Sequence, residues 1–147
     1  LARLLGPVRA VAESRLLADP ARRSLWGHSF GALFALYTLA TRPEAFARYA
    51  AISPSVWWDA PLVNGLADQI RGGGQRLLLA VGDAEKHRGT PNAGAQTPAG
   101  PPPATMALGR RLAAVPGLEV TRAVYPGAAH IDSLTASLPQ TLALAAQ

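Results

Sequence analysis

The pentapeptide Gly27-His28-Ser29-Phe30-Gly31, called the elbow below, matches the pattern G-x-S-x-G. It follows a short apolar segment typical of a strand and precedes Ala32 to Thr41, which is almost wholly apolar and typical of a buried helix. On such a sharp strand-to-helix turn, the serine Oγ is exposed at the carboxyl end of the sheet. We therefore predict that Ser29 is a nucleophile. The helix N-terminus favours negative charge there, and the N–H of Phe30 can donate to a developing oxyanion. Both flanking glycines are expected to be required, because a side chain would collide with the neighbouring strand or helix.

A serine hydroxyl needs a general base, and the chain contains three histidines. His28 lies inside the elbow, where its side chain is expected to point away from Oγ and to serve as packing. His87 lies at the start of a proline- and glycine-rich segment and is expected to be solvated. His130 follows the strand predicted to end at Tyr125, so it lies at a strand's carboxyl end, as Ser29 does. The sequence therefore predicts His130 as the base.

The third member of such a site is an acid that lies between serine and histidine in the chain. The turn Val81-Gly82-Asp83-Ala84-Glu85 leaves the most hydrophobic predicted strand. Glu85 is favoured, because it lies far enough round the turn to reach a histidine. Asp83 is the close competitor, and a serine–histidine pair without an acid is a third possibility. Asp132 is too near His130 in sequence and is expected to cap the last helix together with Ser133.

Helices and strands alternate along the chain, which predicts an α/β fold with a parallel sheet and helices on both faces. The run Leu77 to Val81 is typical of a strand buried on both faces, whereas Leu118 to Tyr125 alternates as in a strand nearer an edge. A long loop is predicted at 88–103, at the mouth of the pocket, where it would shape access. The expected helices are 1–17, 32–41, 61–70, 105–115 and 131–146, and the expected strands are 23–26, 49–53, 75–81 and 118–125. Gly6-Pro7 interrupts the spacing of the first helix, so its start is expected near Pro7.

Composition excludes several classes of protein. The chain has 147 residues, of which 49% are hydrophobic and 16% charged, so it is not intrinsically disordered. It has no cysteine, which excludes disulfides, thiolate metal sites and cysteine nucleophiles. The net charge is +5, but the arginines are scattered and aromatic residues are few, unlike a nucleic-acid-binding surface. The longest apolar runs fall far short of the roughly 20 residues that a membrane span needs.

The segment Leu25 to Tyr37, together with Phe46 and the stretch Ser53-Pro54-Ser55-Val56-Trp57-Trp58-Asp59, resembles the esterase branch of the α/β-hydrolases. Within that branch the chain is most similar to the enterobactin/salmochelin esterase-like proteins, which hydrolyse esters of catecholate siderophores. The resemblance runs from about Arg3 to the C-terminus. It implies Ser29 as the nucleophile, His130 as the base, an acid in the turn Gly82 to Glu85, and no metal or organic cofactor.

Two features depart from the family pattern. Ala32 stands where many relatives have a second glycine, a change that should leave the elbow intact. Relatives also have several strands before the elbow, one of whose loops supplies the second oxyanion donor. The chain is therefore expected to be the C-terminal portion (1–147) of one α/β-hydrolase domain. Its strand leading to Trp26 should lie at an exposed edge, where the N-terminal part of the same protein or another chain would complete the sheet.

The resemblance implies a serine esterase acting on a small-molecule ester, with a siderophore ester as the sharpest substrate hypothesis. A generic small-ester carboxylesterase, an acyltransferase and a structural half-domain that is inactive alone are the alternatives. Trp57 and Trp58 allow two interpretations. One ring is expected to pack in the core under the preceding strand, and at least one could line an aromatic substrate pocket.

Overall fold

Four parallel strands form one sheet in the order β1-β2-β3-β4 in the computed structural model, which describes residues 1–16, 19–87 and 100–147. The strands are β1 (Ser24–His28), β2 (Arg48–Ile52), β3 (Arg76–Gly82) and β4 (Glu119–Tyr125). Consecutive strands are neighbours in register, with Ser24 opposite Arg48, Arg48 opposite Arg76, and Arg76 opposite Glu119. Because all four run the same way, their carboxyl ends meet at one edge of the sheet.

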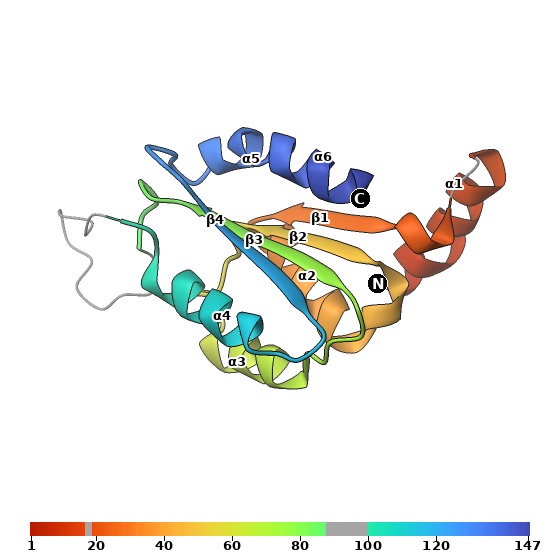
Figure 1. Ribbon diagram of the computed structural model, residues 1–147, viewed down its shortest axis with the longest axis horizontal. Helices are drawn as coiled ribbons and strands as arrows, with labels where there is room; N and C mark the ends of the chain where they lie inside the picture. The colour runs from red at the N-terminus through yellow and green to blue at the C-terminus, as the bar shows by residue number, and fades with distance from the viewer. Residues whose placement is uncertain (17–18, 88–99) are drawn as a thin grey trace.

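Helices cover both faces of the sheet (Figure 1), as the alternation of elements predicts. One face carries α2 (Phe30–Thr41), α3 (Ala60–Gln69) and α4 (Pro103–Ala113), and the other carries α5 (Asp132–Ala136) and α6 (Leu138–Ala146). The helical turns η1 (Leu4–Val8), η2 (Pro20–Arg22) and η3 (Pro43–Ala45) and the helix α1 (Arg9–Arg15) complete the described elements. The α/β fold with a parallel sheet is confirmed.

Two hydrophobic clusters lie on the two faces. The larger joins α2, α3 and α4 to the odd-numbered side chains Tyr49, Ala51, Leu77 and Leu79. The smaller places Ala50, Ile52, Leu78 and Ala80 beneath Leu144 of α6. Strands β2 and β3 are therefore buried on both faces, as the run Leu77 to Val81 predicted, and they fix the two turns that follow them.

The two outer strands are β1 and β4, as expected, and Trp26 on β1 is 41% exposed. The N-terminal segment η1–α1 contains no buried residue and lies beyond the amino-terminal end of β1 (Figure 1). Its helical turn begins at Leu4 and not near Pro7, with non-helical backbone at Gly6. Within the described residues, no helix is long and apolar enough to cross a membrane.

The last predicted helix is in fact two. The expectation of one helix over 131–146 is wrong, because α5 ends at Ala136 and α6 begins at Leu138 with Pro139 in its first turn. Proline has no N–H to continue the helical ladder and fits the first turn of a new helix. The break leaves α5 beside the carboxyl end of the sheet while α6 runs across the smaller cluster.

Candidate active site

The elbow lies at the carboxyl end of β1, and its backbone holds Ser29 at φ +60°. Ser29 N–H donates to the Ile52 carbonyl at 2.9 Å, which extends the sheet by one bond before α2 begins. A Cβ at Gly27 would lie 2.1 Å from the Gly31 carbonyl oxygen, so the first glycine of the motif is required. The expectation for Gly31 is wrong, because a Cβ there would meet nothing within 4 Å. The close contact between the backbones of Gly27 and Gly31 therefore requires glycine at position 27 and not at position 31.

Three side chains form a continuous hydrogen-bonded path at this edge. His130 Nε2 lies 3.0 Å from Ser29 Oγ, and His130 Nδ1 lies 2.8 Å from Glu85 Oε2. A carboxylate only accepts hydrogen bonds, so Nδ1 carries the proton and Nε2 of the neutral ring accepts from the serine hydroxyl. That tautomer is the one a general base beside a serine nucleophile requires.

Glu85 is held by the turn that follows β3. Its side chain is buried, and Oε1 accepts from the N–H of Gly82 at 2.9 Å and from the hydroxyl of Ser53 at 2.5 Å. A Cβ at Gly82 would lie 2.0 Å from the Ala128 carbonyl oxygen, so this glycine lets the turn carrying Glu85 approach the loop that leads to His130. Burial combined with three hydrogen-bond donors gives Oε2 one fixed position beside the imidazole.

The competing carboxylates point elsewhere. Asp83 Oδ1 accepts from the N–H of Gly127 at 2.6 Å and therefore braces the turn after β4. Asp132 is the first residue of α5 and not its cap, and its Oδ2 accepts from the N–H of Ala129 at 3.1 Å. The expected capping role of Ser133 is also wrong, because Ser133 is fully buried and its Oγ contacts Ser53 and the His130 carbonyl.

The other two histidines lie outside this path. His87 is 5% exposed, and its Nε2 lies 2.8 Å from the Gly100 carbonyl oxygen, so the expectation that it is solvated is wrong. The ring instead contacts the backbone that leads to α4. The Nε2 of His28 donates to the His130 carbonyl at 2.7 Å, so this hydrogen bond goes to the backbone of His130 and not to Ser29. The two rings of His28 and His130 are 4.7 Å apart.

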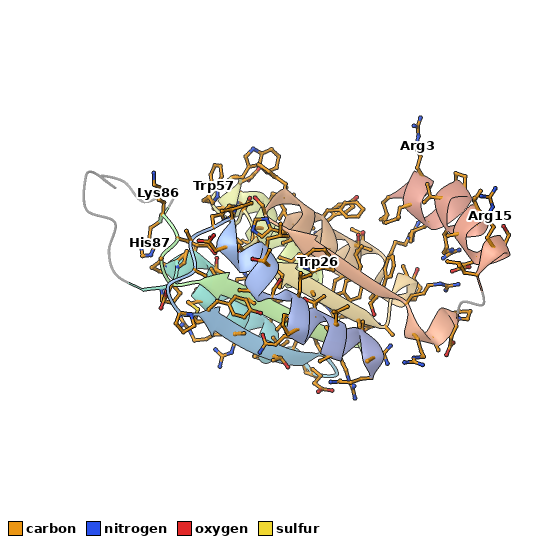
Figure 2. All side chains as sticks on the ribbon, turned by 90° about the horizontal axis from the view of Figure 1, so that it is seen from above. Arg3, Arg15, Trp26, Trp57, Lys86 and His87 are labelled. Atoms are coloured by element: carbon orange, nitrogen blue, oxygen red, sulfur yellow. The ribbon has the colours of Figure 1, made fainter. Side chains whose placement is uncertain are left out.

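A cavity of about 570 Å³ opens in front of Ser29 and His130. Trp57 and Lys86, which line it, lie at the end of the molecule opposite Arg3 and Arg15 (Figure 2). The predicted loop at 88–103 lies mostly outside the described residues, since 88–99 are not described. Its last residues include Pro102, which lines the cavity, and Pro103, which begins α4.

Neither tryptophan packs in the core, which corrects the expectation for one of them. Trp57 is 38% exposed and Trp58 is 55% exposed. Both rings contact Phe30 edge to face, at centroid distances of 6.3 and 5.8 Å. The segment leaves β2 at the edge of the sheet and turns outward, so its aromatic rings gather around the elbow and not beneath the strand.

Three serines contact this site that the sequence did not predict to lie there. Ser53 contacts the Glu85 carboxylate, Ser133 contacts the His130 carbonyl, and Ser55 Oγ lies 3.1 Å from Ser29 Oγ. Ser53 ends the predicted strand 49–53 and Ser55 follows it, at the same edge as the elbow, and that position was the available signal. Their burial and their partners depend on contacts between segments far apart in the chain.

Comparison with known proteins places this geometry in context. A family model described as "Putative esterase" matches residues 8–142. Over 75 residues the chain is 37% identical to the ferri-bacillibactin esterase BesA of Bacillus subtilis, a match covering 47% of the chain and 26% of that protein. Among solved structures, the BES protein of Bacillus cereus superposes with a TM-score of 0.79 at 23% identity, covering 98% of the chain and 52% of that structure. The enterobactin and salmochelin hydrolase IroE superposes with a TM-score of 0.68 at 22% identity, over 99% and 55% respectively. The chain thus spans about half the length of these solved structures, which share its fold.

Proposed function

The chain belongs to the esterase family whose model it matches over residues 8–142, and from this premise we propose that the complete protein is a serine esterase. The observation that carries the proposal is the hydrogen-bonded path from Ser29 through His130 to Glu85. Ser29 is proposed as the nucleophile, His130 as the base and Glu85 as the acid that orients it. Asp83 is not favoured, because its carboxylate contacts the Gly127 N–H.

The proposed reaction runs through an acyl-enzyme. Nε2 of His130 takes the proton of Ser29 as Oγ attacks the ester carbonyl, and Glu85 stabilises the imidazolium that forms. The N–H of Phe30, at the start of α2, donates to the oxyanion of the tetrahedral intermediate. His130 then protonates the leaving alcohol, and water repeats the cycle on the acyl-serine. Every proton moves among these side chains, substrate and water, so no step calls for a metal or organic cofactor.

A siderophore ester is the proposed substrate, as in the enterobactin/salmochelin esterase-like proteins. The cavity is large enough for a sizeable acyl group, and Phe30 and Trp57 give it an aromatic wall. Lys86 also lines it, so an aromatic acyl group carrying acidic hydroxyls would find both stacking surface and positive charge. Similarity to the ferri-bacillibactin esterase BesA and to the enterobactin and salmochelin hydrolase IroE points the same way.

We further propose that residues 1–147 are the C-terminal portion of one α/β-hydrolase domain. Its partner would be the N-terminal part of the same protein, or another chain, added at the free edge of β1. Support comes from the half-length coverage of the solved structures and from the outer position of β1, where Trp26 is exposed. The added part would supply the second oxyanion donor. Losing such a donor typically costs about 10²–10³ in rate.

The test uses the full-length protein, a fluorophosphonate probe and two esters, a p-nitrophenyl ester and a siderophore trilactone. Ser29→Ala should abolish labelling and hydrolysis while the thermal midpoint changes by no more than a few degrees, because Oγ adds little packing. Ser24→Ala, an exposed serine on β1, is the matched control and should keep both activities. Full activity in Ser29→Ala would refute the nucleophile.

The same assay separates the alternative functions. A generic carboxylesterase would cleave the p-nitrophenyl ester and leave the siderophore intact, whereas an acyltransferase would transfer the acyl group to an added alcohol in preference to water. An inert structural half would react with neither ester nor probe, even though it folds.

A further inference from the structure

Ser53 occupies a backbone conformation that serine rarely adopts. It follows β2 directly, at φ +48°, and is 2% exposed. Among the residues that the structure describes, it shares a positive φ only with Ser29 and four glycines. Glycine is the default residue in this region because it has no Cβ. At Ser29 the proposed nucleophile explains why the residue is not glycine, and a strained serine at the next strand end calls for a comparable reason.

The hydroxyl of Ser53 lies between two buried groups. Its Oγ is 2.5 Å from Glu85 Oε1 and 2.6 Å from Ser133 Oγ. The carboxylate can only accept, so the proton of Ser53 points to Glu85. The one proton of Ser133 is then shared between two acceptors, Ser53 Oγ at 2.6 Å and the His130 carbonyl at 2.8 Å. His28 Nε2–H donates to that same carbonyl at 2.7 Å, so the carbonyl keeps a donor.

We propose that Ser53 is a positioning residue of the active site, whose buried hydroxyl, between Glu85 and Ser133, holds the carboxylate so that Oε2 stays on Nδ1 of His130. The inference rests on the proposed function and deepens it. Gly82 N–H is the other donor to Oε1, and Ser53 is the side chain that completes this anchor. Ser133 and His28 continue the chain of donors back to the His130 backbone, so acid and base are tied at two points.

Two substitutions separate the hydroxyl from the backbone strain. Ser53→Gly keeps the positive φ at no steric cost and removes the hydroxyl, whereas Ser53→Ala removes the hydroxyl and keeps the strain. In the full-length protein, both should lose roughly tenfold in kcat/KM for a p-nitrophenyl ester, the size expected for a hydrogen bond to a charged group. The KM should stay within about twofold. Ser137→Ala is the control, because Ser137 is equally buried but its hydroxyl donates to the Leu134 carbonyl.

Two readouts distinguish positioning from a general structural effect. In a Glu85→Gln background, Ser53→Gly should not reduce the labelling rate further, because the carboxylate it holds is gone. The downfield proton resonance of the His130–Glu85 hydrogen bond, assigned by its loss in His130→Gln, should broaden or vanish in Ser53→Gly and persist in Ser137→Ala. This resonance does not depend on the identity of the ester.

Each outcome decides something different. An active wild-type enzyme in which Ser53→Gly keeps full activity and an unchanged resonance would overturn the positioning role and leave the proposed function standing. An equal tenfold loss with and without the Glu85 carboxylate would also overturn it. If the wild-type protein has no activity but its resonance still depends on Ser53, the proposed function is refuted. The hydrogen bond by which Ser53 positions Glu85 would still be supported.

Discussion

Exchanging Glu85 for glutamine should disable the base by fixing the wrong tautomer of His130. The side chain keeps its size, but one carboxylate oxygen becomes an NH₂ group. Oε1 currently accepts from the N–H of Gly82 and the hydroxyl of Ser53, and Oε2 accepts from Nδ1 of His130. If the amide oxygen keeps the two donors, its NH₂ faces Nδ1. The ring must then accept at Nδ1 and carry its proton on Nε2, where it cannot take the proton of Ser29.

The size of the loss follows from these contacts. Turning the amide round to restore the active tautomer would place NH₂ against the Gly82 N–H and leave a buried donor unsatisfied, which costs about 1–3 kcal/mol. Losing the carboxylate also removes a charge-assisted hydrogen bond to the imidazolium, worth about 1.5–3 kcal/mol. Together these give about 2.5–6 kcal/mol, or about 10²–10⁴ in kcat, at about 1.4 kcal/mol per tenfold change. Glu85→Gln should therefore cost less than Ser29→Ala.

The assay is p-nitrophenyl ester hydrolysis by the full-length protein, with Asp83→Asn as the matched carboxylate-to-amide control. Asp83 accepts from the N–H of Gly127 and does not touch His130, so Asp83→Asn should cost less than tenfold. Thermal unfolding should show that both variants are folded. If Glu85→Gln kept more than a tenth of the activity while Asp83→Asn lost 10²-fold, the acid would be Asp83 and the tautomer argument would fail.

The other predictions concern the base, the aromatic wall and the core. His130→Gln should lower kcat about as much as Ser29→Ala does, because such groups act as a unit. His87→Ala should lower the thermal midpoint and change kcat little. A loss of kcat in His87→Ala but not in His130→Gln would reject His130 as the base. Trp57→Ala should raise KM for an aryl ester roughly tenfold and leave an alkyl ester nearly unaffected, and equal changes for both esters would remove Trp57 from the binding wall. Burial raises the pKa of Tyr49 to about 12 from its usual 10, so the free energy of unfolding should be highest below pH 10 and fall as the pH rises toward 12. Denaturant unfolding between pH 10 and 12 should show a smaller fall in the free energy of unfolding for Tyr49→Phe than for the wild type. An identical fall in both proteins would show that Tyr49 is not its cause.

The elements of the fold could be predicted from local patterns of residues. Apolar runs such as Leu77 to Val81, with proline or glycine beyond their ends, predict strands and helices with errors of a few residues at the ends. The break before α6 was missed although Pro139 marks it, because the apolar spacing continues across the break. Proline removes a backbone donor wherever it stands, so its position should outweigh the spacing.

Chain order and strand ends also suggested which side chains would meet. In a parallel sheet the carboxyl ends of all strands lie at one edge, so the sequence could predict that Ser29, Glu85 and His130 lie close together. Sequence alone left Asp83 open, since it lies on the same turn as Glu85. Which carboxylate faces His130 depends on hydrogen bonds from other segments. The Gly127 N–H donates to Asp83, whereas the Gly82 N–H and the Ser53 hydroxyl donate to Glu85.

The sequence by itself determined the α/β class, the elbow and the residues available for chemistry, because these depend on spacing and on chemical type within short segments. Only the tertiary structure decided burial and partnership across long separations. It placed His87 beneath the backbone at Gly100, turned Trp57 and Trp58 outward to Phe30, and joined Ser53 to Ser133, 80 residues away. A hydroxyl at a strand end has no recognisable role until the opposite segment supplies its acceptor, and that requires the whole sheet to be assembled.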